Sequence, residues 1–142
     1  MTAYQRILAA VDLTEDSRAV AARACELAAP GASVRLLHVI EFVPIEPMSD
    51  SLVPVMQIDD QSIARARAQI CNLALELGLP QDAGSVEIGS AKAEILRHAR
   101  EQRSQLIVLG CRERHGLSIL IHRTEDSVLH GAPCDVLAVR VR

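Results

Sequence analysis

The sequence has very few aromatic residues. Tyr4 and Phe42 are the only ones among its 142 residues, and tryptophan is absent. Proteins that bind single-stranded nucleic acid usually stack the bases on aromatic side chains. The formal net charge of -3 also opposes binding to a phosphate backbone. The composition therefore argues against nucleic acid as the main partner.

The sequence also lacks paired-cysteine motifs and long apolar segments. Its cysteines are Cys25, Cys71, Cys111 and Cys134. They are far apart, without CxxC or zinc-finger spacing, which favours reduced thiols in a cytosolic protein. No apolar run approaches the ~18 residues of a membrane-spanning helix, and the N-terminal run is too short for a signal peptide. We therefore expect a cytoplasmic protein that binds neither a membrane nor a structural metal.

What the sequence does contain is an alternation of apolar runs and helical patterns within one expected domain, residues 1–142. Strands are predicted at residues 6–11, 33–42, 85–89, 104–110 and 135–141. Helices are predicted at about 14–28, 59–77, 91–101 and 120–129, the first capped by "TEDS" and ended by "PG". Residues 43–60 contain three prolines and are predicted to form a long loop.

This order of elements predicts an α/β fold, an open parallel sheet with helices on both faces. Ligands of such sheets bind at the carboxyl ends of the strands, where the strand order reverses. If the first strand is central, the crevice lies between the ends of the first and fourth strands. Asp12 and the loop after Gly110 would then face each other.

Four segments together resemble the universal stress protein family: "YQRILAAVDLTEDS", "LLHVI", "LIVLGCRERHGL" and "VLHGAPCDVLAVRV". The resemblance covers nearly the whole chain and implies five parallel strands in the order 3-2-1-4-5, a Rossmann-like fold of the adenine nucleotide alpha hydrolase type. It also implies a cytoplasmic homodimer that pairs through the last strand. The family acts in survival of stress rather than as conventional metabolic enzymes.

The resemblance also leads to a prediction about ATP binding. Some family members bind ATP through Gly-x-x-Gly, followed eight or nine residues later by Gly-Ser or Gly-Thr. Here Gly110 matches the first glycine, but Glu113 replaces the second, and His122 and Arg123 replace the later pair. Glycines bring bare backbone N–H groups against phosphate oxygens, and a carboxylate ~4 Å from a phosphate costs about 1 kcal/mol even in water. This pattern predicts weak or no ATP binding.

The same segment supports the opposite interpretation. The planar guanidinium group of arginine can donate two parallel hydrogen bonds to a phosphate. Arg112 and Arg123 could therefore bind phosphates in place of the missing glycines. The other positions that the resemblance assigns to nucleotide are Ala10, Asp12, Val39, Gly110 and Thr124. The alternative hypothesis, a regulatory switch that binds ATP with Mg²⁺, is therefore retained. Asp12 also has a purely local interpretation, as an acceptor for a turn or a helix cap.

Catalytic and metal chemistry find little support in the sequence. No nucleophile, base and orienting group can be assembled from its order, so we expect no enzyme, or at most weak ATP hydrolysis. Cys111, His115 and His122 are too few for a structural zinc site. Cys111 has arginines nearby, which would suit a reactive thiol, but a buried small residue is the simpler interpretation. His38 lies in an apolar run and is expected to be a satisfied core histidine.

The last apolar run, "DVLAVRV", is predicted to form an edge strand with open hydrogen-bonding groups. Pairing with a second copy about a two-fold axis would close this edge. The interface would contain Val136, Leu137, Val139 and Val141. The alternatives are an edge protected by Arg140 and Arg142, or a heterodimer with a related chain.

Overall fold

The computed structural model describes residues 3–41, 59–112 and 124–141. The elements are β1 (Tyr4–Ala10), α1 (Ser17–Leu27), β2 (Ala28–Glu41), α2 (Asp60–Glu76), the short 3-10 helix η1 (Gln81–Ala83), β3 (Gly84–Gly89), α3 (Ala91–Glu101), β4 (Leu106–Arg112), α4 (Thr124–Gly131) and β5 (Asp135–Val141). The predicted loop at 43–60 lies outside the described residues except for its last two positions, which belong to the start of α2.

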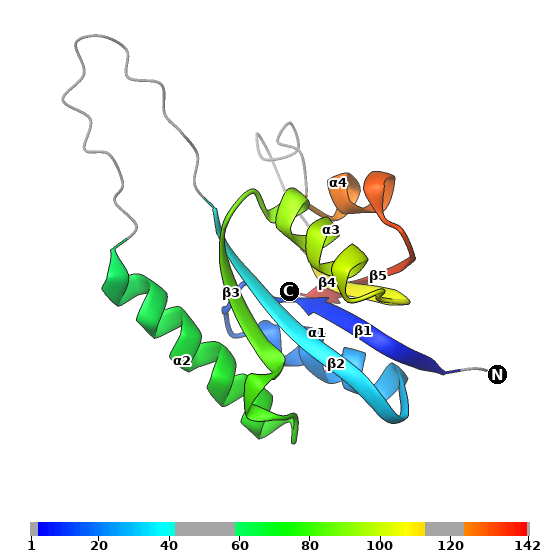
Figure 1. The fold of residues 1–142 in the computed structure, drawn as a ribbon, viewed down its shortest axis with the longest axis horizontal. Helices are drawn as coiled ribbons and strands as arrows, with labels where there is room; N and C mark the ends of the chain where they lie inside the picture. Colours follow the sequence, from blue (N-terminus) through cyan, green and yellow to red (C-terminus); the bar gives the residue numbers. More distant parts are fainter. Residues whose placement is uncertain (1–2, 42–58, 113–123, 142) are drawn as a thin grey trace, which may run out of the picture.

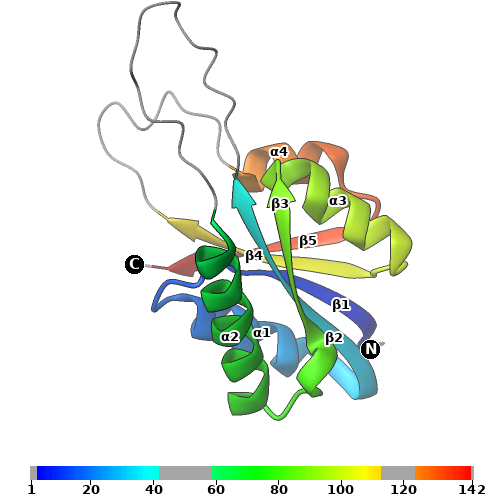
Figure 2. The same ribbon diagram turned by 60° about the vertical axis from the view of Figure 1, so that its left-hand side comes forward.

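The strands form one sheet in the order β3-β2-β1-β4-β5, with every neighbouring pair parallel. Helices α1 and α2 cover one face and α3 and α4 cover the other (Figures 1 and 2). The predicted fold class and strand order are confirmed. Because the chain turns from β1 toward β2 on one face and from β3 toward β4 on the other, the strand order reverses beside β1.

The core consists of two apolar layers, one on each side of the sheet. The first packs Ile7, Ala9 and Val108 against α1 and α2, and the second packs Leu8 and Ile107 against α3 and α4. Successive strand residues alternate between these layers. Both faces of the central strands are therefore buried, as their nearly continuous apolar sequences predict.

Helix α3 has the predicted bounds, because both of its ends carry clear signals. Ser90 Oγ accepts a hydrogen bond from Ala93 N–H at the start, and His98 and Arg100 lie in the last turn, where cations suit the helix dipole. Helix α2 begins similarly, with Asp59 accepting from Ser62 N–H. Side-chain caps next to a periodic apolar pattern thus located these helix ends.

Helix α1 begins later than predicted. The sequence "TEDS" was expected to cap it near Thr14, but the first helical residue is Ser17, and no acidic residue lies in the first turn. The cause is Asp12, whose carboxylate accepts hydrogen bonds from Thr14 and Ser17 and so stabilises a turn ahead of the helix. A local side-chain acceptor has replaced the expected helical turn.

The predicted end of the first helix at about residue 28 is confirmed, because α1 ends at Leu27. The predicted start of the second strand, after Pro30 and Gly31, was wrong. Strand β2 begins at Ala28 and continues through both residues. Gly31 has a φ of 77°, and the register with β1 shifts between the pairs Tyr4–Ala28 and Arg6–Ser33. The two residues form an irregularity within the strand, where glycine supplies the left-handed conformation.

The last predicted helix is partly confirmed. It was expected at about 120–129, and α4 spans Thr124–Gly131; residues 120–123 lie outside the described part of the chain. Strand β4 begins two residues late, at Leu106, because Ser104 N–H still donates to Ala99 O at the end of α3. Strand β5 has the predicted bounds.

Candidate functional site: a cavity at the carboxyl ends of the strands

A cavity of about 520 Å³ lies at the carboxyl ends of β1, β2 and β4. Its wall is completed by the first residues of α1 and α3 and by the end of β5. The lining includes Ala10, Asp12, Asp16, His38, Val39, Glu41 and Gly110. The cavity is therefore at the reversal of strand order, where parallel sheets of this kind bind ligands.

Asp12 holds the segment that connects β1 to α1. Its Oδ1 accepts hydrogen bonds from Thr14 N–H at 3.1 Å, Thr14 Oγ–H at 2.7 Å and Ser17 Oγ–H at 3.0 Å. The local interpretation of Asp12 is thus confirmed. The same residue also lines the cavity, so holding this loop and facing a ligand are compatible roles.

His38 is a cavity residue that the sequence interpretation did not place there. Its ring is half-buried, and Nδ1 lies 2.9 Å from Val11 O. A carbonyl oxygen can only accept, so Nδ1 carries the proton and donates it. Val11 N–H in turn donates to Leu37 O at 2.8 Å. His38 is satisfied, as expected, and it ties the end of β1 to β2 at the edge of the cavity.

The positions expected to bind nucleotide fall into two groups. Ala10, Asp12, Val39 and Gly110 all line the cavity, although they come from three strands and the turn after β1. Arg112 ends β4 and Thr124 begins α4, but their side chains, and Glu113, His122 and Arg123 altogether, lie outside what the structure describes. The described residues thus include the adenosine half of the expected site.

The described wall of the cavity is acidic. It carries three carboxylates, Asp12, Asp16 and Glu41, and neither lysine nor arginine is among the described residues that line it. Asp16 and Glu41 were not singled out in the sequence. Asp16 follows the turn held by Asp12, and Glu41 ends the buried strand β2, which is where a sequence search for polar residues after strands could have found it.

Gly110 has a packing role independent of any phosphate. A Cβ at this position would lie 3.3 Å from Val20 Cγ2 and 3.6 Å from Val141 Cγ2. The glycine therefore lets α1 and β5 approach β4 closely beside the cavity. Its presence supports a nucleotide site less strongly than the sequence pattern alone suggests.

Comparisons with known proteins agree with this geometry. The model of the universal stress protein family matches residues 3–140. The chain belongs to the universal stress protein family. Universal stress protein A homolog 2 of Coxiella burnetii is 33% identical over the whole chain and 99% of its own length.

Two solved structures illustrate the fold of the family. Universal stress protein UspA from Lactobacillus plantarum is 22% identical with a TM-score of 0.74, and the match covers 99% of this chain and 100% of that one. A universal stress protein in complex with cAMP is 18% identical with a TM-score of 0.63, covering 97% and 98%. At these identities the likeness shows the fold alone. In the described part of this chain, no helix has the length and apolar character to cross a membrane.

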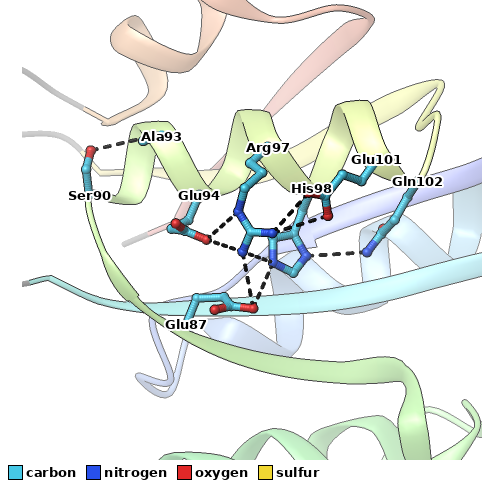
Figure 3. Close-up of polar contacts among 8 residues, drawn as sticks. All are labelled: Glu87, Ser90, Ala93, Glu94, Arg97, His98, Glu101 and Gln102. Atoms are coloured by element: carbon cyan, nitrogen blue, oxygen red, sulfur yellow. Dashed lines mark hydrogen bonds and ion pairs between the residues drawn. The ribbon is translucent and has the colours of Figure 1, made fainter.

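Outside the cavity, this family member has a second polar cluster, between β3 and α3 (Figure 3). Glu87, Glu94 and His98 place possible metal-ligand atoms within 4.8 Å of one another. The guanidinium of Arg97 already contacts all three, at 3.4 Å from Glu87 and 3.3 Å from His98. The hydrogen bonds that Arg97 donates to the carboxylates of Glu94 and Glu101 raise its pKa. A metal ion would have to displace this arginine.

The four cysteines form no disulfide with one another, and all four are half-buried. Burial raises the pKa of Cys25 and of Cys134, which keeps both as thiols near neutral pH. Cys111 lies on β4 beyond Gly110 and is not among the residues of the cavity wall. The idea of a redox role for Cys111 therefore stays a prediction from its position.

Strand β5 is at one end of the strand order and pairs with β4. Val136, Leu137 and Val139 are half-buried and pack against the two core layers. Val141 differs from them, because only 8% of its surface is exposed and it packs beside Gly110. Any dimer through β5 would engage Val141 mainly through its backbone.

Proposed function

We propose that this chain is a cytoplasmic universal stress protein that acts as a homodimer, without conventional catalysis, and binds ATP weakly or not at all. Family membership supports a role in the stress response. The weak binding of ATP rests mainly on one observation, the acidic wall of the cavity at the carboxyl ends of the strands.

Electrostatic repulsion opposes the binding of a triphosphate in this cavity. A triphosphate would enter a cavity whose described wall carries Asp12, Asp16 and Glu41 and neither lysine nor arginine. Each charge pair at ~4 Å costs about 1 kcal/mol in water and several times that in a partly excluded site. Glu113 would add a fourth carboxylate in the segment where other family members have glycine. Adenosine has no charge to repel and suits an apolar floor that includes Ala10 and Val39.

A titration of the purified protein with two ligands tests this proposal. Adenosine and ATP with Mg²⁺ are each followed by isothermal titration calorimetry, after nucleotide carried over from purification has been excluded by absorbance. We expect adenosine to bind at least as tightly as ATP. ATP binding that is tighter by ~10-fold or more would contradict the proposal, because it would require a cationic site for the phosphates.

A gain-of-function variant provides the control. Glu113→Gly with His122→Gly and Arg123→Ser restores the glycines that the family resemblance assigns to phosphate binding. If their loss weakens ATP binding, the triple variant binds ATP more tightly than the native chain and binds adenosine equally. An unchanged ATP affinity would contradict the idea that loss of these glycines weakens ATP binding.

The second candidate function is a switch that binds ATP with Mg²⁺. It is favoured by the presence of all four described nucleotide positions, Ala10, Asp12, Val39 and Gly110, around one cavity. The structure of a family member with cAMP shows that a nucleotide can be bound within this family. In a switch, Arg112 or Arg123 would supply the cation that the described wall lacks, and Asp12 would face the ligand.

The homodimer would form by pairing of β5 with its own copy. The position of β5 at the end of the sheet and its half-buried Val136, Leu137 and Val139 support this. A proline at Ala138, an exposed position in the middle of β5, removes one backbone N–H donor from this strand. Analytical sedimentation measures the oligomeric state of Ala138→Pro and of a control variant, Leu129→Ser, which changes an exposed residue of α4. If the dimer forms through β5, only Ala138→Pro should be monomeric. A native monomer would contradict the homodimer.

A further inference from the structure

A second, smaller cavity lies at the opposite end of the sheet, at the amino ends of β1 and β2. Its volume is about 210 Å³, and its wall consists of Arg6, Ile7, Ser33, Arg35, Gln102 and Ser104. The charged residues of this wall are two arginines. None of the ion pairs among the described residues includes Arg6 or Arg35.

The sheet register brings the two arginines together. Arg6 is paired with Ser33, and Leu8 is paired with Arg35, so Arg6 and Arg35 are diagonal neighbours on adjacent strands. Both project to the face that α3 covers, because residues two apart in a strand share a face with Leu8 and Leu37 of that layer. Diagonal neighbours lie ~7–8 Å apart, which long side chains span easily.

Each of the two guanidinium groups donates one of its N–H groups to a backbone carbonyl oxygen and has further N–H groups to donate. Arg6 Nε–H donates to Arg103 O at 2.8 Å, and Arg35 Nη1–H donates to Asp82 O at 2.9 Å. These hydrogen bonds fix both side chains and leave their remaining N–H groups for a ligand. The carboxyl end of α3 contributes a partial negative charge of only ~0.5, so the two full positive charges dominate.

Two buried polar groups complete the wall. Ser104 is 8% exposed and lines the cavity, where its hydroxyl can donate to a ligand. Gln102 Oε1 is buried and has no donor among the described residues. Buried polar groups almost always have a partner. A ligand that brings both anionic oxygens and one O–H group would satisfy the arginines, the serine and the amide together.

From this cavity we infer a binding site for a small tetrahedral oxyanion, inorganic phosphate. Its anionic oxygens accept from Arg6, Arg35 and Ser104, and its P–O–H group donates to Gln102 Oε1 once the amide, whose oxygen is buried in the ligand-free chain, turns toward the cavity. Sulfate lacks an O–H group near neutral pH, and a phosphate monoester, with its second pKa near 6, mostly lacks one at pH 7.5. The acceptor therefore favours inorganic phosphate over both. The site is separate from the nucleotide cavity and does not depend on the proposed function.

The test is calorimetric titration of the full chain at pH 7.5 and constant ionic strength with three probes: inorganic phosphate, methyl phosphate and sulfate. We expect saturable binding that is tightest for inorganic phosphate. Nuclear magnetic resonance spectra of the native protein should show phosphate-dependent shifts at the amides of Ser33, Arg35 and Ser104. Sulfate binding equal to that of phosphate, or shifts confined to the other cavity, would overturn the assignment.

Matched variants locate the binding. Replacing one arginine, as in Arg35→Gln, is expected to weaken phosphate binding ~10-fold or more, and Arg6→Gln with Arg35→Gln about 100-fold, as for loss of hydrogen bonds to a charged group. Arg65→Gln with Arg67→Gln changes the same charge on exposed positions of α2 and should bind as the native chain does. Equal loss in both double variants would overturn the site.

One further variant keeps the test valid if the double variant does not fold. Ser33 is exposed and lines the cavity, so Ser33→Asp adds a negative charge there without removing an internal contact. We expect it to abolish the response to phosphate with little change in folding. Undiminished phosphate binding by a folded Ser33→Asp variant would contradict the inference.

Discussion

The two cavities at opposite ends of the sheet have described walls of opposite charge. At the carboxyl ends of the strands, a cavity of about 520 Å³ is lined by Asp12, Asp16 and Glu41. At the amino ends, a cavity of about 210 Å³ is lined by Arg6 and Arg35. The fold favours ligands at the carboxyl ends, yet the described arginines that line a cavity lie at the other end. Fold thus indicates where a ligand can bind, whereas the side chains decide which charge it carries.

The two cavities also differ in how the chain builds them. The wall at the carboxyl ends depends on turns after strands, such as the one that Asp12 holds through Thr14 and Ser17. The wall at the amino ends combines strand residues, where the register places Arg6 beside Ser33, with Gln102 and Ser104 from the segment between α3 and β4. Both cavities therefore join residues of regular strands to residues of connecting segments.

The largest expected effect comes from the core that both cavities share. Leu8 is fully buried between the two ends, paired with Arg35 on one side and Ile107 on the other. Leu8→Ala should lower the free energy of unfolding by about 2–5 kcal/mol, measured by urea denaturation. Because the substitution disturbs the core beneath both cavities, the binding of adenosine and the binding of phosphate should weaken together. Loss of only one would show that the two ends are held independently.

The next effect should separate the two ends. The double variant Arg6→Gln with Arg35→Gln is expected to weaken phosphate binding about 100-fold and to leave adenosine binding within about twofold, since distant sites without shared partners act independently. Paired titrations of both ligands measure this. A parallel loss of adenosine affinity would mean that the two cavities are coupled through the sheet.

A smaller effect is expected at the turn after β1. Asp12→Ala removes the acceptor for Thr14 and Ser17 and should cost about 1–2 kcal/mol of stability, as loss of a helix cap does. Asp12→Asn keeps an acceptor oxygen and should cost less. Thermal or urea unfolding measures the difference. If both variants are equally unstable, the charge of Asp12 rather than its hydrogen bonds holds the turn, and phosphate binding at the far end should remain native in either case.

The sequence predicted much of the fold because the signals were local. Alternating apolar runs predicted a parallel sheet, and Ser90 capping α3 located a helix start. The predicted start of β2 was wrong because a proline followed by a glycine is compatible both with a break between two elements and with an irregularity inside a strand. The start of α1 was wrong because Asp12 competes for the same backbone as the helix.

The candidate sites were predictable only in part. Ala10, Asp12, Val39 and Gly110 were found from a family resemblance, and they line one cavity. Their role in nucleotide binding stays a prediction. The basic cavity was missed because Arg6 and Arg35 are far apart in the sequence and become neighbours only through the register of β1 with β2. An arginine near the start of each of two apolar runs was the available signal.

The smallest expected effect concerns Gly110, where the packing and ligand roles can be separated. Gly110→Ala places a Cβ 3.3 Å from Val20 Cγ2, a tight contact that the neighbour can relieve by a small shift. The cost should be about 1 kcal/mol, at the low end for overpacking, with adenosine binding nearly native. Gly84→Ala, whose Cβ would lie 2.9 Å from Ile70 Cγ2, should cost more and leave both ligands unaffected. If Gly110→Ala abolishes adenosine binding without further loss of stability, Gly110 contacts the ligand directly, and the acidic cavity depends on backbone exposure as well as on its charges.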